Sequence, residues 1–219
     1  MKQLLDEISA IRINPNAYEE WGDYRKKLTD IVIAGTSRGD TLAVYGAGSC
    51  NDIDLGRFAE HFSEITLLDI NEEAMKSAVR RYGLDGFPKV RTEFFDFVGI
   101  SEEDYERIAG RMNEVLDLTE APITEEKLVM KLRPAIETFY GALERNLFRA
   151  PRYDAVLAAG LHSQLNQTAV SIWRNLCDRR GIETDPLHDP VSSLFHERTY
   201  PIIVRSPVSS FMTERARSI

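Results

Sequence analysis

Residues 41–52 read TLAVYGAGSCND, a short β-branched and apolar run that leads into a glycine-containing turn. Apolar residues then recur at helical spacing, at Leu55, Phe58, Ala59 and Phe62. Extended apolar runs favour strands, and a repeat of three and four residues favours an amphipathic helix. The segment therefore predicts a strand, a tight loop and a helix in succession.

The same alternation continues toward the C-terminus. ITLLD (65–69) predicts a second strand, followed by a helix that Asn71 caps and Gly83 ends. VRTEFFD (90–96) and YDAVLAAG (153–160) predict a third and a fourth strand, the last one buried on both faces. Because strands that alternate with helices form parallel sheets, the sequence predicts an α/β fold with a Rossmann-like, doubly wound, mainly parallel sheet.

Helical segments flank and interrupt this pattern. Residues 1–40 predict an N-terminal helical extension, with a stripe of apolar residues at Trp21, Tyr24, Leu28 and Ile31. Residues 41–219 form the main domain, and residues 97–152 are a helical insertion between the third and fourth strands. Ser101 and Asp104 have the spacing of a capping box at the start of the first inserted helix.

Composition excludes several classes of function. The chain has 219 residues and a net charge of −8, and this acidity argues against a nucleic-acid partner. No apolar run approaches the roughly 20 residues of a membrane-spanning helix, and the acidic N-terminus argues against a signal peptide. Two cysteines, Cys50 and Cys177, are typical of free thiols in a reducing compartment, so we expect a cytoplasmic protein. The four histidines have no metal-ligand spacing, and no metal is expected.

Glycine and carboxylate residues fall at the ends of three successive predicted strands. Gly46-Ala47-Gly48 follows the first strand, Asp69 ends the second and Asp96 ends the third. Glycines let the backbone approach a ligand closely, and a carboxylate at Asp69 can accept hydrogen bonds from both hydroxyls of a ribose. Asp96 can accept from an adenine amino group. Open α/β sheets bind ligands at this edge, so the combination predicts a nucleoside site.

With these features the sequence resembles the class I S-adenosylmethionine-dependent methyltransferases. The stretches that carry the resemblance are VYGAGSCND (44–52), LLDIN (67–71), EFFDF (93–97) and YDAVLAAGLHSQL (153–165). The resemblance implies S-adenosylmethionine as cofactor, with the methionine moiety facing Gly46, Ala47 and Gly48, and the ribose bound by Asp69. It further implies that Ile70 flanks the adenine, that Asp96 and Phe97 hold the adenine edge, and that Ala159 and Gly160 line the floor below the sulfonium.

The sequence departs from the family pattern at two positions of the glycine turn. Val44 stands where the family usually has an acidic residue, and Cys50 stands where it usually has a third glycine. Asn51 and Asp52 are candidates for the missing polar contact to the ligand's amino group. We expect the C-terminal strands of the family to be reduced or missing here, with either a truncated chain or a partner subunit of a homodimer that covers the sheet edge as the explanation.

Two other functions compete with methyl transfer. One is a noncatalytic nucleoside-binding or assembly module of the same fold, which the departures at Val44 and Cys50 keep open. The other is an NAD-dependent oxidoreductase. That class needs a third glycine where this chain has Asn51, and Asp52 and Asp54 would repel the pyrophosphate of the dinucleotide. A cationic sulfonium suits these acidic surroundings better.

The reaction implied by the resemblance transfers a methyl group to a small-molecule acceptor. Such a transfer needs a base only if the acceptor has a proton to lose. His162, just after the fourth predicted strand, is the candidate base, although a purely structural role at the strand end is an equal alternative. The helical insertion is expected to form a lid that excludes water and selects the acceptor.

Overall fold

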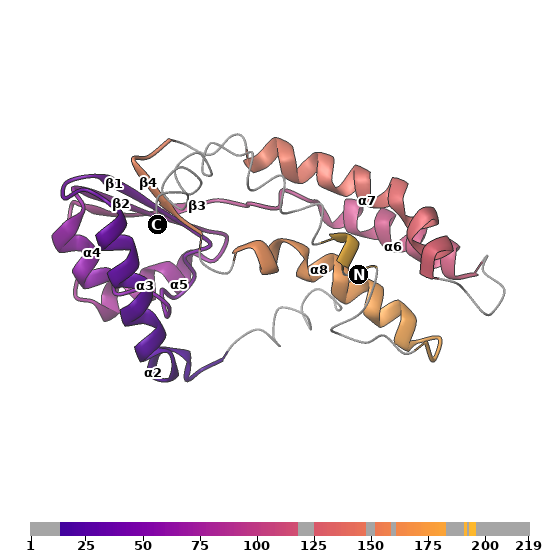
Figure 1. Ribbon diagram of the computed structural model, residues 1–219, viewed down its shortest axis with the longest axis horizontal. Coiled ribbons are helices and arrows are strands. Elements are labelled where there is room, and N and C mark those ends of the chain that lie inside the picture. The colour runs from indigo at the N-terminus through magenta and orange to yellow at the C-terminus, as the bar shows by residue number, and fades with distance from the viewer. Residues whose placement is uncertain are drawn as a thin grey trace. The chain divides into compact units, whose positions relative to one another are not determined.

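The computed structural model describes residues 14–117, 125–147, 152–158, 161–182, 191 and 193–195 (Figure 1). The chain divides into two compact units. Among the described residues, the sheet unit contains 14–97, 152–158 and 161, and the helical unit contains 98–117, 125–147, 162–182, 191 and 193–195.

Four parallel strands form the sheet of the sheet unit, counted over the described residues. They are β1 (Thr41–Tyr45), β2 (Glu64–Asp69), β3 (Val90–Phe94) and β4 (Ala155–Leu157), in the order β3-β2-β1-β4. Ala43 pairs with Thr66 of β2 on one side and with Val156 of β4 on the other. The first strand therefore lies inside the sheet. β2 and β3 are added on one side of it, and the chain then crosses over to add β4 on the other side. This arrangement, flanked by helices, confirms the predicted Rossmann-like α/β class.

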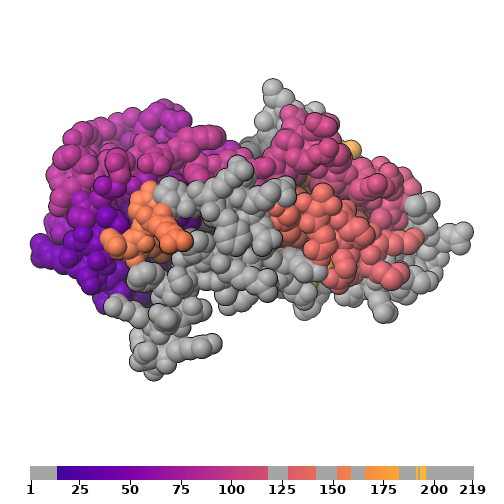
Figure 2. Space-filling view, turned by 90° about the horizontal axis from the view of Figure 1, so that it is seen from above, coloured from indigo at the N-terminus to yellow at the C-terminus, as the bar shows by residue number. Residues whose placement is uncertain are grey.

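The two inner strands are buried, and the outer ones less so. β1 is buried except at its first residue and β2 except at its two end residues, which explains their continuous apolar runs. β3 alternates between half-buried and exposed residues, and Phe94 is exposed. β4 is the opposite edge and lies at the surface against the N-terminal elements of its unit (Figure 2). Both predicted outer strands are shorter in the structure than the 90–96 and 153–160 expected.

Helices α4 (Leu55–His61) and α5 (Glu72–Arg81) follow the predicted cap signals. The Asp54 side chain accepts a hydrogen bond from the Arg57 amide, and the Asn71 side chain accepts one from the Ala74 amide. Leu55, Phe58, Ala59 and Phe62 are buried in the core of the unit, as their spacing predicts.

Helices α2 (Ala17–Glu20) and α3 (Gly22–Gly35) are the described helices of the predicted N-terminal extension, and they turn a different face to the core. The predicted stripe is wrong at three of its four members, because Trp21, Tyr24 and Ile31 are exposed. Thr29 is buried instead, with Leu28, Val32 and Ile33 beside the core. The reason is a tertiary hydrogen bond, in which the Thr29 hydroxyl accepts from the Asp54 amide at 2.9 Å.

The helical unit contains α6 (Glu102–Asp117), α7 (Glu125–Leu147) and nearly all of α8 (Leu161–Asp178). α6 and α7 form the predicted insertion between β3 and β4 (Figure 1). The capping box is present, since the Asp104 amide donates to Ser101 Oγ at 3.1 Å and the Ser101 amide donates to Asp104 Oδ2 at 3.3 Å. α7 continues through Pro134, which leaves one carbonyl of the preceding turn without its usual helical donor.

The core of the helical unit is aromatic. The Tyr140 hydroxyl donates to Asn166 Oδ1 at 3.1 Å and to the carbonyl of Phe195, and the rings of Phe139, Tyr140 and Phe195 pack edge to face or tilted. Within the described ranges, no helix is long and apolar enough to cross a membrane. The predicted loss of C-terminal strands concerns residues 196–219, which lie outside the described residues.

Candidate functional site

The glycine turn after β1 is held against the end of β2. The amides of Gly46 and Ala47 both donate to the Leu68 carbonyl, at 2.9 and 3.1 Å. Gly46 and Gly48 have φ angles of +68° and +47°, in the left-handed region that favours glycine. The turn therefore needs glycine at both positions, and its backbone amides gather at the carboxyl ends of the two central strands.

Asp69, the last residue of β2, faces this turn. Its Oδ2 accepts from the Gly48 amide at 2.9 Å, and its Oδ1 accepts from the Asn71 amide at 2.8 Å. An ionised carboxylate has about four acceptor positions, so roughly two remain beyond these two bonds. The next side chain, Ile70, is 61% exposed and adds an apolar surface beside the carboxylate.

The segment after β3 joins the same edge. The Phe95 amide donates to the Asp69 carbonyl at 3.1 Å, which extends the β2–β3 ladder by one bond. The buried ring of Phe97 packs on Tyr45 with 5.0 Å between ring centroids. Asp96 lies between these two anchored residues. The predicted residues Gly46, Ala47, Gly48, Asp69, Ile70, Asp96 and Phe97 thus belong to three adjacent strand ends of one unit.

Two arginines that sequence reasoning missed hold the far side of the glycine loop. The Arg25 guanidinium donates to the Asn51 carbonyl at 2.9 Å, and the Arg81 guanidinium donates to Asn51 Oδ1 at 2.9 Å and to the Ser49 carbonyl at 3.3 Å. Both guanidiniums lie over the ring of Tyr18, at 3.9 and 4.3 Å from its centroid. The hydrogen bonds hold Asn51 from two helices, and the cation–π contacts position the two guanidiniums on Tyr18. No signal in the sequence joins three segments so far apart.

The loop between the glycine turn and α4 contains two ionisable groups with shifted pKa values. Burial raises the pKa of the Cys50 thiol, with Asp52 contributing in the same direction, so the thiol is protonated at neutral pH. Burial also raises the pKa of Asp52. In both groups the cause is burial, which disfavours the charged form.

Three predicted residues remain, Ala159, Gly160 and His162. Ala159 and Gly160 lie outside the described residues. His162 is the second residue of α8 and belongs to the helical unit, and its side chain is outside the described part of the structure. Among the residues that the structure describes, no group of three or more His, Cys, Asp or Glu side chains could hold a metal ion.

No protein-family model and no curated protein matches the chain. Several solved structures are similar to it, and three of them are described here. The N-methyltransferase NodS from Bradyrhizobium japonicum WM9, in complex with S-adenosyl-L-homocysteine, is 13% identical over 80% of this chain and 84% of NodS, with a TM-score of 0.31. A SAM-dependent methyltransferase from Thiobacillus denitrificans, also with S-adenosyl-L-homocysteine, is 15% identical over 90% and 94% of the two chains, with a TM-score of 0.30. The [4+2]-cyclase SpnF is 14% identical over 82% and 87%, with a TM-score of 0.28.

Proposed function

We propose that the protein is an S-adenosylmethionine-dependent methyltransferase that acts on a small molecule. The observation that carries this proposal is the Asp69 carboxylate, which the Gly48 amide holds at the junction of the glycine turn and β2. A carboxylate there, with free acceptor positions and an exposed apolar neighbour, suits a nucleoside.

The residues present fit the methyl donor. Asp69 would accept from the ribose hydroxyls, and Ile70 would flank the adenine. Asp96 and Phe97 would hold the adenine edge, Gly46, Ala47 and Gly48 would face the methionine moiety, and Ala159 and Gly160 would line the floor. When bound, the cofactor supplies a methyl group already activated by the sulfonium. The protein's own contribution is therefore to position the two reactants and exclude water.

A dinucleotide fits this loop poorly. In dinucleotide sites the helix starts at the glycine turn, and its N-terminus binds the pyrophosphate. Here α4 starts at Leu55, and the carboxylate of Asp54 already caps it. Asn51, in the third glycine position, is tied to Arg25 and Arg81. The N-terminus of α4 is therefore not open to a pyrophosphate in the way a dinucleotide site requires.

For acceptors with a proton to lose, we propose His162 as the general base. Replacing His162 with Gln should lower kcat and remove a pKa near 6.5 from the pH–rate profile, because an unperturbed imidazole titrates at about that pH. An unchanged profile would return His162 to a structural role.

We also propose that α6 and α7 select the acceptor, so that deleting residues 101–149 changes acceptor choice and leaves donor affinity largely intact. A complete loss of donor binding would contradict this role.

Calorimetric titration of the full chain with S-adenosylmethionine, S-adenosylhomocysteine and NADH tests the proposed function. We expect both sulfur nucleosides to bind and NADH not to bind. Binding of none of the three would favour a noncatalytic module, and binding of NADH alone would favour an oxidoreductase. Time-dependent conversion of S-adenosylmethionine to S-adenosylhomocysteine with a library of small molecules then identifies the acceptor.

Replacing Asp69 with Asn tests the ribose contact. We expect the affinity for S-adenosylhomocysteine to fall roughly 10- to 100-fold, since hydrogen bonds to a charged group contribute about 1.5–3 kcal/mol. Asp85→Asn is the matched control, because Asp85 is an exposed carboxylate of the same unit. Equal affinity of the two variants would overturn the assignment of Asp69.

A further inference from the structure

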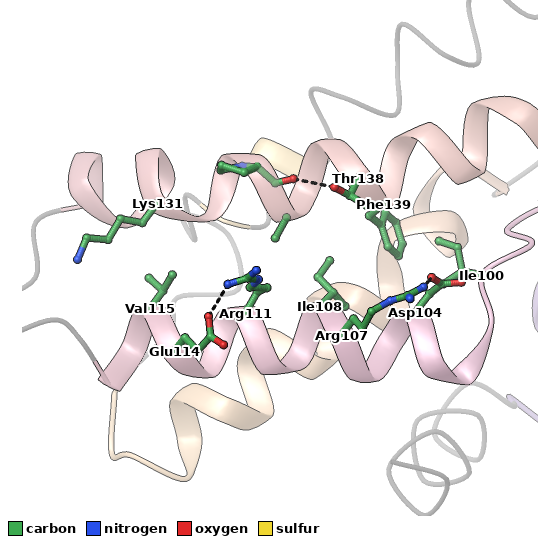
Figure 3. Close-up of a pocket in the computed structure, with 12 residues that line it drawn as sticks. Ile100, Asp104, Arg107, Ile108, Arg111, Glu114, Val115, Lys131, Thr138 and Phe139 are labelled. Carbon is green, nitrogen blue, oxygen red and sulfur yellow. Dashed lines mark hydrogen bonds and ion pairs between the residues drawn. The ribbon is translucent and has the colours of Figure 1, made fainter.

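A second candidate binding site lies entirely within the helical unit. A cleft of about 730 Å³ opens between α6 and α7, and the residues that line it are all described (Figure 3). This volume is within the range of roughly 300–1,000 Å³ that small-molecule sites have. Its lining combines apolar side chains with three cations, Arg107, Arg111 and Lys131.

The most buried apolar residues of the lining lie toward the start of α6. Ile100, Ile108 and Phe139 are there, each at least nine-tenths buried (Figure 3). The Phe139 ring is anchored from behind by Tyr105, at 5.9 Å between ring centroids. The cleft therefore offers a fixed apolar surface against which a chain or ring can pack.

The opposite end of the cleft is cationic. Arg111 projects from α6 toward α7, and Lys131 extends from α7 beyond Val115 at the same end (Figure 3). Arg111 is paired with Glu114 at 2.8 Å, which leaves most of its five N–H donors available. Within the described part of the chain, no carboxylate lies within ion-pair distance of Lys131. Among the described residues, Lys131 is therefore the cation of this end that has no ion-pair partner.

The two carboxylates in the lining are already committed. Asp104 accepts from the Ser101 amide and hydroxyl and pairs with Arg107, and Glu114 pairs with Arg111. The Ser101 hydroxyl, followed by the Arg107 guanidinium, holds the pKa of Asp104 below its ordinary value. Arg107 is also paired with Glu103, so the charge is unbalanced only at the other end, where Arg111 and Lys131 face one carboxylate of the lining, Glu114, and leave a single positive charge. A ligand with one negative charge balances this positive charge. A phosphate with two negative charges would be repelled by Glu114 and would lack a second cation to balance it.

We propose that this cleft binds a small amphipathic monocarboxylate, with its carboxylate near Lys131 and Arg111 and its apolar body against Ile108 and Phe139. This inference goes beyond the proposed methyl transfer and does not depend on it. The protein as a whole has a net charge of −8, so a preference for an anion has to arise locally in the cleft.

Decanoate and decylammonium, each below its micelle concentration, are the probes. They share one apolar chain and carry opposite charges. In calorimetric titrations of the full chain without methyl donor, we expect decanoate to bind and decylammonium to bind more weakly or not at all. Because the overall negative charge favours the cation, equal or tighter binding of decylammonium would overturn the proposal, as would no binding of decanoate.

Two kinds of variant locate the binding in the cleft. Replacing Lys131 with Gln should weaken decanoate binding about two- to fivefold, and replacing Arg111 and Lys131 together should weaken it about tenfold, since exposed ion pairs contribute about 0.2–1 kcal/mol each. Lys89→Gln, an exposed lysine of the sheet unit, should change nothing. Ala135→Phe should fill the cleft and abolish binding while all its charges remain. Decanoate binding that is the same in Ala135→Phe as in the wild type, at an unchanged unfolding midpoint, would place the probe elsewhere and overturn the proposal.

Discussion

Cys50 has a backbone conformation that only glycine adopts freely. Its φ angle is +48°, and its side chain is fully buried in the core around β1 and α4. A left-handed conformation costs an L-residue roughly 1–2 kcal/mol, and a β-branched residue more. The packing of the thiol against the core offsets this cost, which explains how cysteine takes a position that the resembled family usually gives to glycine.

We therefore expect two substitutions of Cys50, by glycine and by valine, to change the free energy of unfolding by different amounts. Glycine relieves the backbone strain and loses the thiol packing, so the free energy of unfolding should change by less than about 1 kcal/mol. Valine keeps the apolar volume and worsens the strain, and should cost about 2–4 kcal/mol. Urea denaturation measures both. A glycine variant less stable than the valine variant would show that packing, and not the φ angle, dominates at Cys50.

Thr66 is a polar residue in the centre of the buried strand β2. Its hydroxyl is fully buried and has no hydrogen-bond partner among the described residues. Replacing Thr66 with Val removes an unsatisfied polar group and introduces a good strand former. We expect the free energy of unfolding to rise by about 1 kcal/mol. In the control, Thr92→Val on the edge strand β3, the change should stay within about 0.5 kcal/mol. A destabilised Thr66→Val variant would mean that the hydroxyl has a partner after all.

At the scale of elements, the capping box of α6 should make that helix sensitive to acid. The Ser101 hydroxyl and then Arg107 lower the pKa of Asp104 from its ordinary value of 3.8. A lowered pKa means that the carboxylate stabilises the folded helix above about pH 4, and that this contribution is lost as the pH falls through the lowered value.

Replacing Ser101 with Ala should remove the cap. We expect a loss of about 1 kcal/mol at pH 6, the usual value for an N-cap side chain, and a smaller loss at a pH below the lowered pKa of Asp104, where its carboxyl group is protonated. Hydrogen exchange of the amides in the first turn of α6 measures it locally. Ser77→Ala, an exposed serine within α5, is the control. An effect of equal size at both pH values would show that the contribution of the cap does not depend on the ionisation of Asp104.

The elements that sequence patterns predict well are those with a local signal. The capped helices α4 and α5 and the apolar strands β1 and β2 lie where their residues indicate, because caps and burial on both faces leave a readable pattern. The apolar stripe of α3 was predicted on the wrong face, because the tertiary hydrogen bond from Asp54 buries Thr29. The strand ends that gather Gly46, Gly48 and Asp69 were predictable from parallel topology. The contacts of Tyr18 with Arg25 and Arg81 were not, since they depend on how helices dock.

At the scale of the whole molecule, the two units have separate cores, each with one buried cysteine. Cys50 is buried in the sheet unit and Cys177 in the helical unit. A buried thiol reacts only when its surroundings open, and burial further raises the pKa of Cys50. The two cysteines are therefore independent reporters of the two cores.

We expect both thiols to be protected from DTNB under native conditions and to become reactive at different urea concentrations. Separate cores open as separate cooperative units, so two transitions should appear. Mass spectrometry of the labelled peptides identifies which cysteine reacts first. A single urea concentration at which both become reactive would show that the units unfold together.

The central place of β1 also has a consequence for how the chain is made. β1 is synthesised first of the four strands, yet its second neighbour is β4, and Thr41 and Asp154, which join the two strands through hydrogen bonds at 2.8–3.1 Å, are 113 residues apart. At ordinary rates of translation that separation takes on the order of ten seconds. Throughout this time the amides and carbonyls on one side of β1 in the nascent chain have no β4 to pair with, so another strand can pair with them. The nascent chain is therefore most vulnerable to mispairing while the insertion is being made, and a chaperone would be most useful to it then.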